Sequence, residues 1–552
     1  MPEHLIILFC VIPLVAGLVS VALVNQPRLA RLLGVVSFSS TLVLAVGMAV
    51  HIYRAGGAVL VSQLGGWPAP FGISIVCDSL SALLLAASSM VALASFIHSF
   101  GSLAPETERR YFHPLIQLLM FGVNLSFLTG DLFNLFVGFE IMLMASYALL
   151  SIGATHRQLT QAYKYVLLNV LASTLFLMGA GMTYGMFGTL NIAHLAQIVA
   201  DANAGGPPLP TGFPALAVLM LLVFGLKGAF FPLWFWLPDT YYTVPIAIGG
   251  LFAGMLTKVG VYAVARTFLL IFAAGDDVRL MIGGLIAVSA VFTMFLGVLG
   301  AVSHHEIRRI LSVHVISQVG YMVFGIAVGI LATGGETING ISLAAFGLAG
   351  CVFYMIQHMV VKCALFLCCG LMERMGGSDD LDKIGGLVRR APWLGVLFFI
   401  AAMSLVGLPP LSGFFGKLTI IQAGWGVPGL WVLSLFGLAT GVLTLLSMLK
   451  IWSYGFWNPM PDAAADFTPT PHRQLKAGYV GAAMLVVVAL GLGFAAEPVY
   501  QVAFVAGEQL VDPTAYISAV LGPDAWAGDE TPLPAQAPGA ATAAAPHVEA
   551  TP

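Results

Sequence analysis

Long apolar runs recur along almost the whole chain, separated by short segments that hold most of the charged residues. A membrane-spanning helix needs about 20 predominantly apolar residues. By this measure we expect about fourteen spans, at residues 5–24, 30–52, 73–98, 112–130, 132–152, 161–187, 213–232, 244–272, 279–301, 308–332, 341–370, 391–422, 428–457 and 476–496. The pattern predicts an all-α polytopic membrane protein.

Four segments outside these runs have patterns of their own. Residues 56–75 alternate apolar and polar positions around Gly and Pro, which predicts an extracytoplasmic β-hairpin. Asn191–Ala202 is a short amphipathic segment, and Asp512–Leu521 is expected to form a surface helix. Residues 522–552 are rich in Ala and Pro and are predicted to be a disordered tail.

Composition agrees with the membrane assignment, because only 9% of residues are charged, against roughly 25% in soluble domains. Met1–Val24 lacks a basic n-region and a small-residue cleavage site, so it is interpreted as the first span. The six cysteines lie in apolar runs without CxxC pairs or zinc and iron–sulfur spacings, and no nucleotide-binding loop is found. We therefore expect no metal, no cofactor and no nucleic-acid partner.

Lys and Arg residues are distributed asymmetrically between the loops. Loops after even-numbered spans carry only Arg54 and Arg279. Loops after odd-numbered spans carry fourteen basic residues: Arg28, Arg31, Arg109, Arg110, Arg157, Lys164, Arg308, Arg309, Arg374, Lys383, Arg389, Arg390, Arg473 and Lys476. Because cytoplasmic loops are enriched in Lys and Arg, we predict that the odd loops are cytoplasmic and that both termini are extracytoplasmic.

Lys227 interrupts the apolar run LLVFGLKGAFFPLWFWLPDTYYTVP at residues 221–245, and Pro232 breaks the same span five residues later. A lysine in hydrocarbon is a functional-site candidate by default. Irregular backbone at membrane depth survives only where protein or a water-filled cavity satisfies it. The alternative is a lysine that snorkels to the interface, although Lys227 lies in the middle of its span.

Besides Lys227, five basic residues remain that are not assigned to loops, and all five fall inside predicted spans. Lys258 and Lys362 lie deep in theirs, and Lys417 follows a second helix breaker in GLPPLSGFFGKL. Arg266 lies late in its span and is expected to snorkel outward, whereas for Lys450, beside an aromatic belt, snorkelling and a buried role are both open.

The two interrupted spans suggest an internal repeat, since Lys227 and Lys417 are 190 residues apart. Each unit would contain five helices, spans 4–8 and 9–13, so the two copies would be inverted in the membrane. Paired broken helices in inverted repeats indicate the ion path of a transporter. The predicted divisions are 1–110 with three spans, 111–272 and 279–457 with the two repeats, 458–521 with the last span, and the tail at 522–552.

Glu140 is the one deep charge of span five. A facing lysine would favour the ionised form of both groups, and separating the pair would make the lysine release its proton more readily. We expect Glu140 to pair with Lys227; the alternative is an ion pair that only fixes packing.

The series of buried polar groups continues through His314 to His358 and Lys362, which lie four residues apart on one helix face. Such groups on adjacent helices can hold water and relay protons, although a single histidine can equally be a hydrogen-bonded core residue. The remaining polar candidates, expected at the interfaces or as solvated caps, are His98, His113, His304, His305, Asp78, Asp131 and Asp239.

Three motifs, TGDLFNLFVGFEIMLMASYALLSIG, LKGAFFPLWFWLPDTY and GLPPLSGFFGK, resemble the antiporter-like subunits of respiratory complex I and of Mrp cation/proton antiporters, most of all the D subunits of multisubunit Mrp Na+/H+ antiporters. The resemblance covers about residues 1–500. It implies a central hydrophilic axis made of Glu140, Lys227, Lys258, His358, Lys362 and Lys417, to which the residue pattern adds His314 as a relay. It also implies a cell-membrane hetero-oligomer with other membrane subunits that transports H+ and Na+.

Three hypotheses follow for function. The first is a proton-translocating module of a secondary antiporter, which is not an enzyme. The second is a proton-pumping subunit of a redox-driven complex such as an NADH:quinone oxidoreductase or a membrane-bound hydrogenase. The third, a silent scaffold, does not account for the buried charges. Neighbouring genes for small membrane subunits would favour the first, and genes for iron–sulfur and flavin subunits the second.

Overall fold

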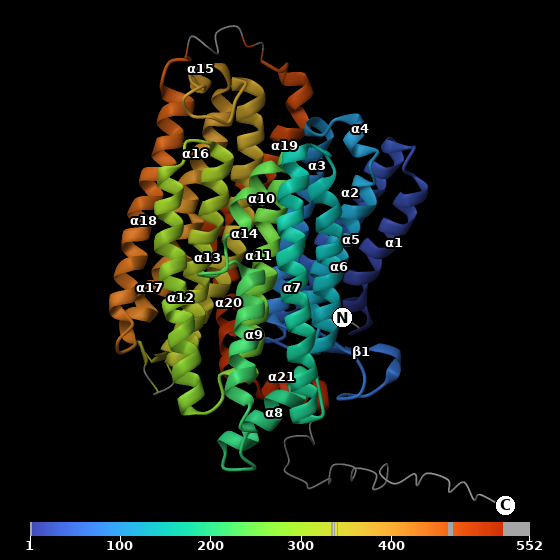
Figure 1. Ribbon diagram of the computed structural model, residues 1–552, viewed down its shortest axis with the longest axis vertical. Coiled ribbons are helices and arrows are strands. Elements are labelled where there is room, and N and C mark those ends of the chain that lie inside the picture. Colours follow the sequence, from blue (N-terminus) through green and yellow to red (C-terminus); the bar gives the residue numbers. More distant parts are fainter. Residues whose placement is uncertain are drawn as a thin grey trace, which may run out of the picture.

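A computed structural model describes residues 3–332, 335, 337–338, 340–461, 467 and 469–522 as an upright bundle of helices (Figure 1). In this part of the chain eleven helices are long and apolar enough to cross a membrane, and three shorter apolar helices accompany them. The long ones are α1 (Leu8–Ala22, preceded by η1, Glu3–Ile7), α2 (Pro27–Arg54), α3 (Ser79–Ser102), α6 (Leu132–Ser151), α7 (His156–Phe187), α11 (Ile246–Thr267, continued by η3, Phe268–Phe272), α12 (Asp276–Ser303), α13 (Ile307–Leu331), α14 (Leu343–Gly376), α18 (Trp431–Trp452, continued by η4, Ser453–Trp457) and α19 (His472–Phe494). The shorter ones are α5 (Phe112–Leu128), α9 (Phe213–Gly228) and α16 (Pro392–Val406). The predicted all-α membrane fold with about fourteen spans is confirmed.

Both predicted helix breaks are present. In span seven α9 ends at Gly228 and α10 (Leu237–Thr243) follows, and in span twelve α16 gives way to α17 (Ser412–Gly426). Helix α12 stabilises the first break, because the Phe231 amide donates to Thr293 Oγ1 at 2.9 Å and Ser289 Oγ donates to the Phe231 carbonyl at 2.9 Å. Protein side chains thus satisfy backbone groups that a continuous helix would have paired, as a membrane interior requires.

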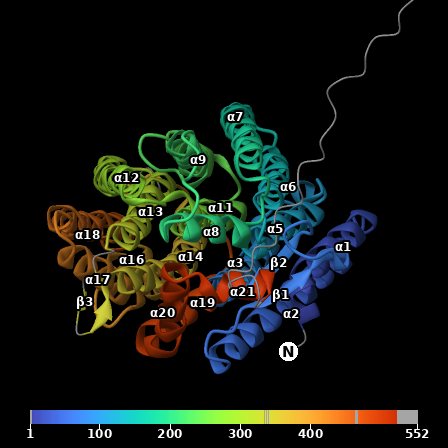
Figure 2. The same ribbon diagram turned by 90° about the horizontal axis from the view of Figure 1, so that it is seen from below.

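The helices that carry the buried lysines and histidines lie inside the bundle. Seen from below, α14 occupies its middle, with α11 and α13 beside it (Figure 2). The most apolar stretches of α13 and α14 are entirely buried, and that of α11 nearly so. Other helices therefore separate the polar groups of these three from the lipid.

Helices α9 and α11 approach closely at two glycines. A Cβ atom added to Gly260 would lie 2.4 Å from the backbone nitrogen of Gly228, closer than any real contact allows. The contact is one residue from Lys227 and two from Lys258, so it fixes the position of both lysine backbones.

The smaller elements cover the ends of the bundle. Strand β1 (Leu60–Gln63) pairs antiparallel with β2 (Ser74–Cys77), so the hairpin is confirmed. The predicted amphipathic and surface helices are α8 (Ile192–Asn203) and α21 (Thr514–Leu521). The remaining short elements are η2 (Leu64–Gly66), α4 (Pro105–Glu108), α15 (Leu387–Arg390), β3 (Thr337–Ile338) and β4 (Ile341–Ser342). The tail predicted at 522–552 lies, beyond Gly522, outside the described residues.

Helix α20 (Ala496–Val511) is not predicted by the apolar pattern. It has only 16 residues and carries Glu497 and Glu508, so it falls below the length and hydropathy of a span. It packs against α14 and α3, where its buried residues join the core.

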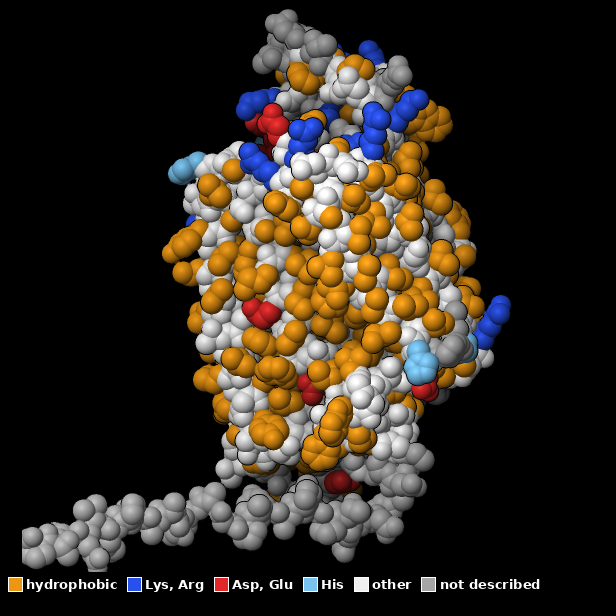
Figure 3. Space-filling model, turned by 90° about the vertical axis from the view of Figure 1, so that its right-hand side faces the viewer, with side chains coloured by type: hydrophobic (Ala, Val, Ile, Leu, Met, Phe, Trp, Pro, Cys, Tyr) orange, Lys and Arg blue, Asp and Glu red, His pale blue; other side chains and the backbone are white. Residues whose placement is uncertain are grey.

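The surface divides into a hydrophobic middle and a basic end. Over the face shown in Figure 3, hydrophobic side chains cover the broad middle of the molecule, and most of the visible Lys and Arg side chains gather at the upper end. In Figure 1 this is the end that carries α4 and α15, whereas α8, α21 and β1 lie at the opposite end.

Two expectations for polar groups at the lower end are wrong. Arg266 does not snorkel: its Nη1 lies 2.6 Å from Asp78 Oδ2, and both side chains are buried. Asp78 does cap α3, accepting from the Ser81 amide at 2.9 Å, but it is not solvated. The reason is that α21 covers this site, with the Tyr516 ring 5.1 Å from the Arg266 guanidinium.

His98 and His113 lie near the ends of α3 and α5, and both are buried, because neighbouring elements cover them. A His98 ring nitrogen lies 3.2 Å from the Gly478 carbonyl of α19, and His113 Nε2 lies 2.9 Å from Glu108 of α4. Burial opposes ionisation of Glu108, but hydrogen bonds from His113 and Arg31 outweigh it and hold the pKa of this carboxyl at about 2.

Candidate functional site

Glu140 of α6 and Lys227 of α9 are joined through a serine of α7. Lys227 Nζ donates to Ser173 Oγ at 2.9 Å, and Ser173 Oγ donates to Glu140 Oε1. Lys227 Nζ also lies 3.4 Å from the Asn169 carbonyl. The expected direct ion pair is therefore replaced by an ammonium–hydroxyl–carboxylate chain, because Ser173 occupies the space between the two charged groups.

This chain is suited to proton transfer. A serine hydroxyl accepts one hydrogen bond while it donates another. A proton that passes from the Lys227 ammonium to Ser173 can be balanced by the serine proton passing to Glu140. Lys227 lies in the last turn of α9, immediately before the break, so a movement of the break would move its ammonium. Lys227 and Ser173 are buried and Glu140 is half-buried.

A second group of charges lies on α11 and α14. Lys258 of α11 is fully buried and donates to the Ala253 carbonyl of its own helix. In the described part of the chain, Lys362 Nζ and both ring nitrogens of His358 have no hydrogen-bond partner. These three residues interact electrostatically with one another, and His358 and Lys362 also interact with Lys417. A buried ammonium without an acceptor is costly, a property that suits a group that holds its proton only transiently.

Lys417 of α17 lies at the second helix break, beside the end of α16. Its Nζ donates to the carbonyls of Leu405 and Val406 at 2.8 and 3.1 Å. These carbonyls end α16 and have no partner within that helix, so the ammonium both caps them and lies at the negative end of the helix dipole. The rings of Tyr321 and Tyr354 approach the same ammonium at 4.8 and 5.7 Å.

Sequence reasoning missed the polar residues that surround Lys417 and His314. Tyr354 OH donates to Gln318 Oε1, and Gln318 Nε2 donates to Thr444 Oγ1 at 3.4 Å. His314 Nε2 lies 2.9 Å from Ser447 Oγ. The signal was present, because the hydroxyls of α18 recur at intervals of three and four residues and so share one helix face.

The seven predicted residues thus fall into two groups. Ser173 joins Glu140 and Lys227, whereas electrostatic interactions connect Lys258, His358, Lys362, Lys417 and His314. Helices α9 and α11 meet at Gly228 and Gly260, yet among the described residues no hydrogen bond or ion pair joins Lys227 to Lys258. The series is interrupted at this point.

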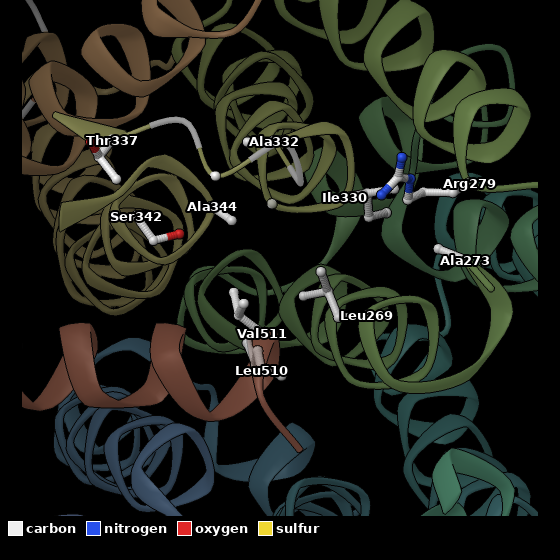
Figure 4. A pocket seen from close by; sticks show the side chains of 12 residues that line it. Leu269, Ala273, Arg279, Ile330, Ala332, Thr337, Ser342, Ala344, Leu510 and Val511 are labelled. Carbon is white, nitrogen blue, oxygen red and sulfur yellow. The ribbon is translucent and has the colours of Figure 1, made fainter. Parts of the chain in front are cut away.

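The cavity shown in Figure 4 lies elsewhere. Its volume is about 330 Å³, and Leu269, Arg279, Ser342 and Val511 are among the residues that point toward it. None of the seven predicted residues lines it. Within the described chain, no cluster of three or more His, Cys, Asp or Glu side chains is placed to hold a metal ion, and the six cysteines are free and buried.

Comparison with known proteins identifies the family. Residues 129–444 match the family described as NADH:quinone oxidoreductase/Mrp antiporter, transmembrane. The chain belongs to this family. It is 41% identical to the D subunit of a Na+/H+ antiporter from Alkalihalophilus pseudofirmus, over 94% of its own length and 99% of the relative. It is 36% identical to the corresponding protein of Bacillus subtilis, with the same two coverages.

A solved structure of the Mrp complex from Dietzia sp. contains a chain that resembles this one with a TM-score of 0.83 and 31% identity. The match covers 95% of this chain and 100% of that chain. The region that defines the family, residues 129–444, includes all seven of the predicted axis residues. Family membership therefore applies to the part of the molecule in which the buried charges lie.

Proposed function

We propose that this chain is the proton-translocating subunit of a multisubunit Na+/H+ antiporter of the Mrp type. Its similarity to antiporter D subunits extends over nearly the whole chain. The observation that carries the proposal is the set of buried lysines and histidines that lies between the break in span seven and the break in span twelve, in two groups that meet where α9 and α11 touch. A transporter subunit of this kind is not an enzyme.

The proposed path begins at the first group of charges. A proton enters at Glu140 and is exchanged with Lys227 through the Ser173 hydroxyl. It then crosses to Lys258, which the close contact of α9 and α11 keeps near, and moves through His358 and Lys362. The path ends at Lys417, where the carbonyls of the second broken helix hold the ammonium. Movement of Lys227 away from Ser173 would interrupt the path and so gate it.

The protein is a multi-pass membrane protein of an antiporter, and we place it in the cell membrane together with the other membrane subunits of its complex. The basic end seen in Figure 3 is proposed to be cytoplasmic, which follows from the enrichment of Lys and Arg in cytoplasmic loops. Both termini would then be extracytoplasmic. The two repeats are proposed to be residues 111–272 and 279–457, each containing one broken helix.

The family also includes the antiporter-like part of NADH:quinone oxidoreductase, so a redox-driven role is the competing function. Sodium/proton exchange distinguishes the two. The chain is co-expressed with its partner subunits in cells that lack other antiporters, and everted vesicles are given an imposed pH gradient but no electron donor. Dissipation of the gradient on addition of Na+ supports the antiporter; exchange that requires an electron donor supports the redox-driven complex.

A further inference from the structure

All hydroxyl-bearing residues of α18 lie on its buried face. Thr440, Thr444 and Ser447 are spaced by four and three residues and are at most 1% exposed. The opposite face carries exposed apolar residues such as Val442 and Leu446. Helix α18 thus presents polar side chains only toward the interior, where it packs against α12, α13 and α17.

Two contacts join these hydroxyls to α13. His314 Nε2 lies 2.9 Å from Ser447 Oγ, and Gln318 Nε2 donates to Thr444 Oγ1 at 3.4 Å. We call His314, Gln318, Thr444 and Ser447 the α13–α18 strip. The inner end of the strip contacts Tyr354, whose hydroxyl donates to Gln318 Oε1. The ring of Tyr354 faces the Lys417 ammonium, so the strip reaches the group of charges around Lys417.

The outer end of the strip leads to the basic end of the bundle. Lys450 follows Ser447 by one turn of α18, and its Nζ donates to the carbonyls of Val302 and His304 at 2.7 and 2.6 Å. These carbonyls lie at the end of α12. The direction of α18 in Figure 1 places Lys450 toward the same end as α15.

His314 is the titratable member of the strip. Its Nε2 faces Ser447, whereas its Nδ1 is buried without a hydrogen-bond partner among the described residues. The ring interacts electrostatically with Lys362, Lys417 and Lys450. The ring therefore interacts both with the lysine near the basic end and with two lysines of the site.

We propose that the α13–α18 strip is a second proton path, which connects the basic end of the bundle at Lys450 with Lys417. Ser447 passes its proton to His314 Nε2 while it receives one from solvent on the Lys450 side, and the imidazolium that forms releases its Nδ1 proton to the neutral amine of Lys417, which becomes an ammonium. One proton enters and one leaves, and reorientation of the ring and the hydroxyl restores the starting state. This inference rests on the proposed antiporter function.

The test uses the complete complex in everted vesicles and compares hydroxyl deletions. Ser447→Ala and Thr444→Val remove hydroxyls from the strip, whereas Ser447→Thr keeps one. Thr174→Val is the matched control, because Thr174, like Thr444, donates to the carbonyl four residues earlier but lies exposed on α7. The amount of assembled complex is measured in parallel for every variant.

We expect Ser447→Ala and Thr444→Val to lower the rate of Na+-driven proton exchange by about tenfold per assembled complex, the scale of one lost hydrogen bond. Ser447→Thr and Thr174→Val should exchange like the wild type. Wild-type exchange rates in both Ser447→Ala and Thr444→Val would overturn the proposed second proton path, and the proposed antiporter function would still stand. If Ser447→Ala does not assemble, the exchange rate of Thr444→Val alone tests the path: a reduced rate supports it and a wild-type rate overturns it. Absence of exchange in the wild type would instead contradict the proposed function.

Discussion

At the scale of single residues, Ser173 is the side chain that changes the interpretation most. Glu140 and Lys227 could be recognised from the sequence, because charges are rare in apolar runs. The serine could not, since membrane helices contain many serines and nothing local distinguishes the one that faces a charge on another helix. With Ser173 between them, the two charges are held apart by one hydroxyl, so the link between them depends on a group that substitution can remove.

We predict that Ser173→Ala lowers Na+/H+ exchange by about tenfold or more in vesicles that contain the whole complex, because the proton link between Lys227 and Glu140 loses its hydroxyl. Ser173→Thr should retain most of the activity. Equal activity of Ser173→Ala and wild type, at equal assembly, would show that the hydroxyl only fills space.

Glu108, which lies outside the membrane spans, is predicted to make the thermal stability of the protein depend on pH. Its folded pKa of about 2 is below the ordinary value of 4.5, so its pairing with Arg31 and His113 stabilises the fold above that ordinary value. This contribution is lost as pH falls through 4.5 toward 2. In thermal unfolding of the purified chain, Glu108→Gln should reduce the dependence of Tm on pH in this range. Exposed Glu106→Gln is the control and should follow the wild type.

At the scale of elements, much of the fold was predictable. Apolar length predicted the spans, and Pro232 together with GLPP predicted both breaks, because proline and glycine act through local backbone geometry. Helix α20 was not predicted, since its 16 residues are stabilised by packing on α14 rather than by their own hydropathy. Arg266 was misplaced for a similar reason: Asp78, distant in the sequence, meets it only in the folded chain.

The contact of α9 with α11 provides a prediction at this scale. Gly260→Ala places a methyl group 2.4 Å from the Gly228 backbone nitrogen, so the two helices must separate. We expect a loss of about 1–3 kcal/mol in stability, as for other overpacked sites, together with reduced exchange. Gly181→Ala on α7 meets nothing within 4 Å and should be neutral in both measurements. Equal stability of the two variants would contradict the close approach.

At the scale of the whole molecule, the basic end of the bundle is predicted to face the cytoplasm. Cysteines introduced singly at Arg390 and Ala519 test this, since both positions are exposed and the six native cysteines are buried. In intact cells a membrane-impermeant maleimide should label Ala519→Cys and not Arg390→Cys, with the pattern reversed in everted vesicles. The opposite labelling would invert the proposed orientation.

The proposed proton axis is tested by Na+/H+ exchange of the complete complex with Lys227→Ala, compared with Lys164→Ala. Both variants remove one lysine, but Lys227 is buried in the proposed path and Lys164 is exposed on α7. We predict that Lys227→Ala assembles and loses exchange, whereas Lys164→Ala keeps the wild-type rate. Wild-type exchange by an assembled Lys227→Ala complex would show that protons do not pass this lysine and would contradict the proposed axis.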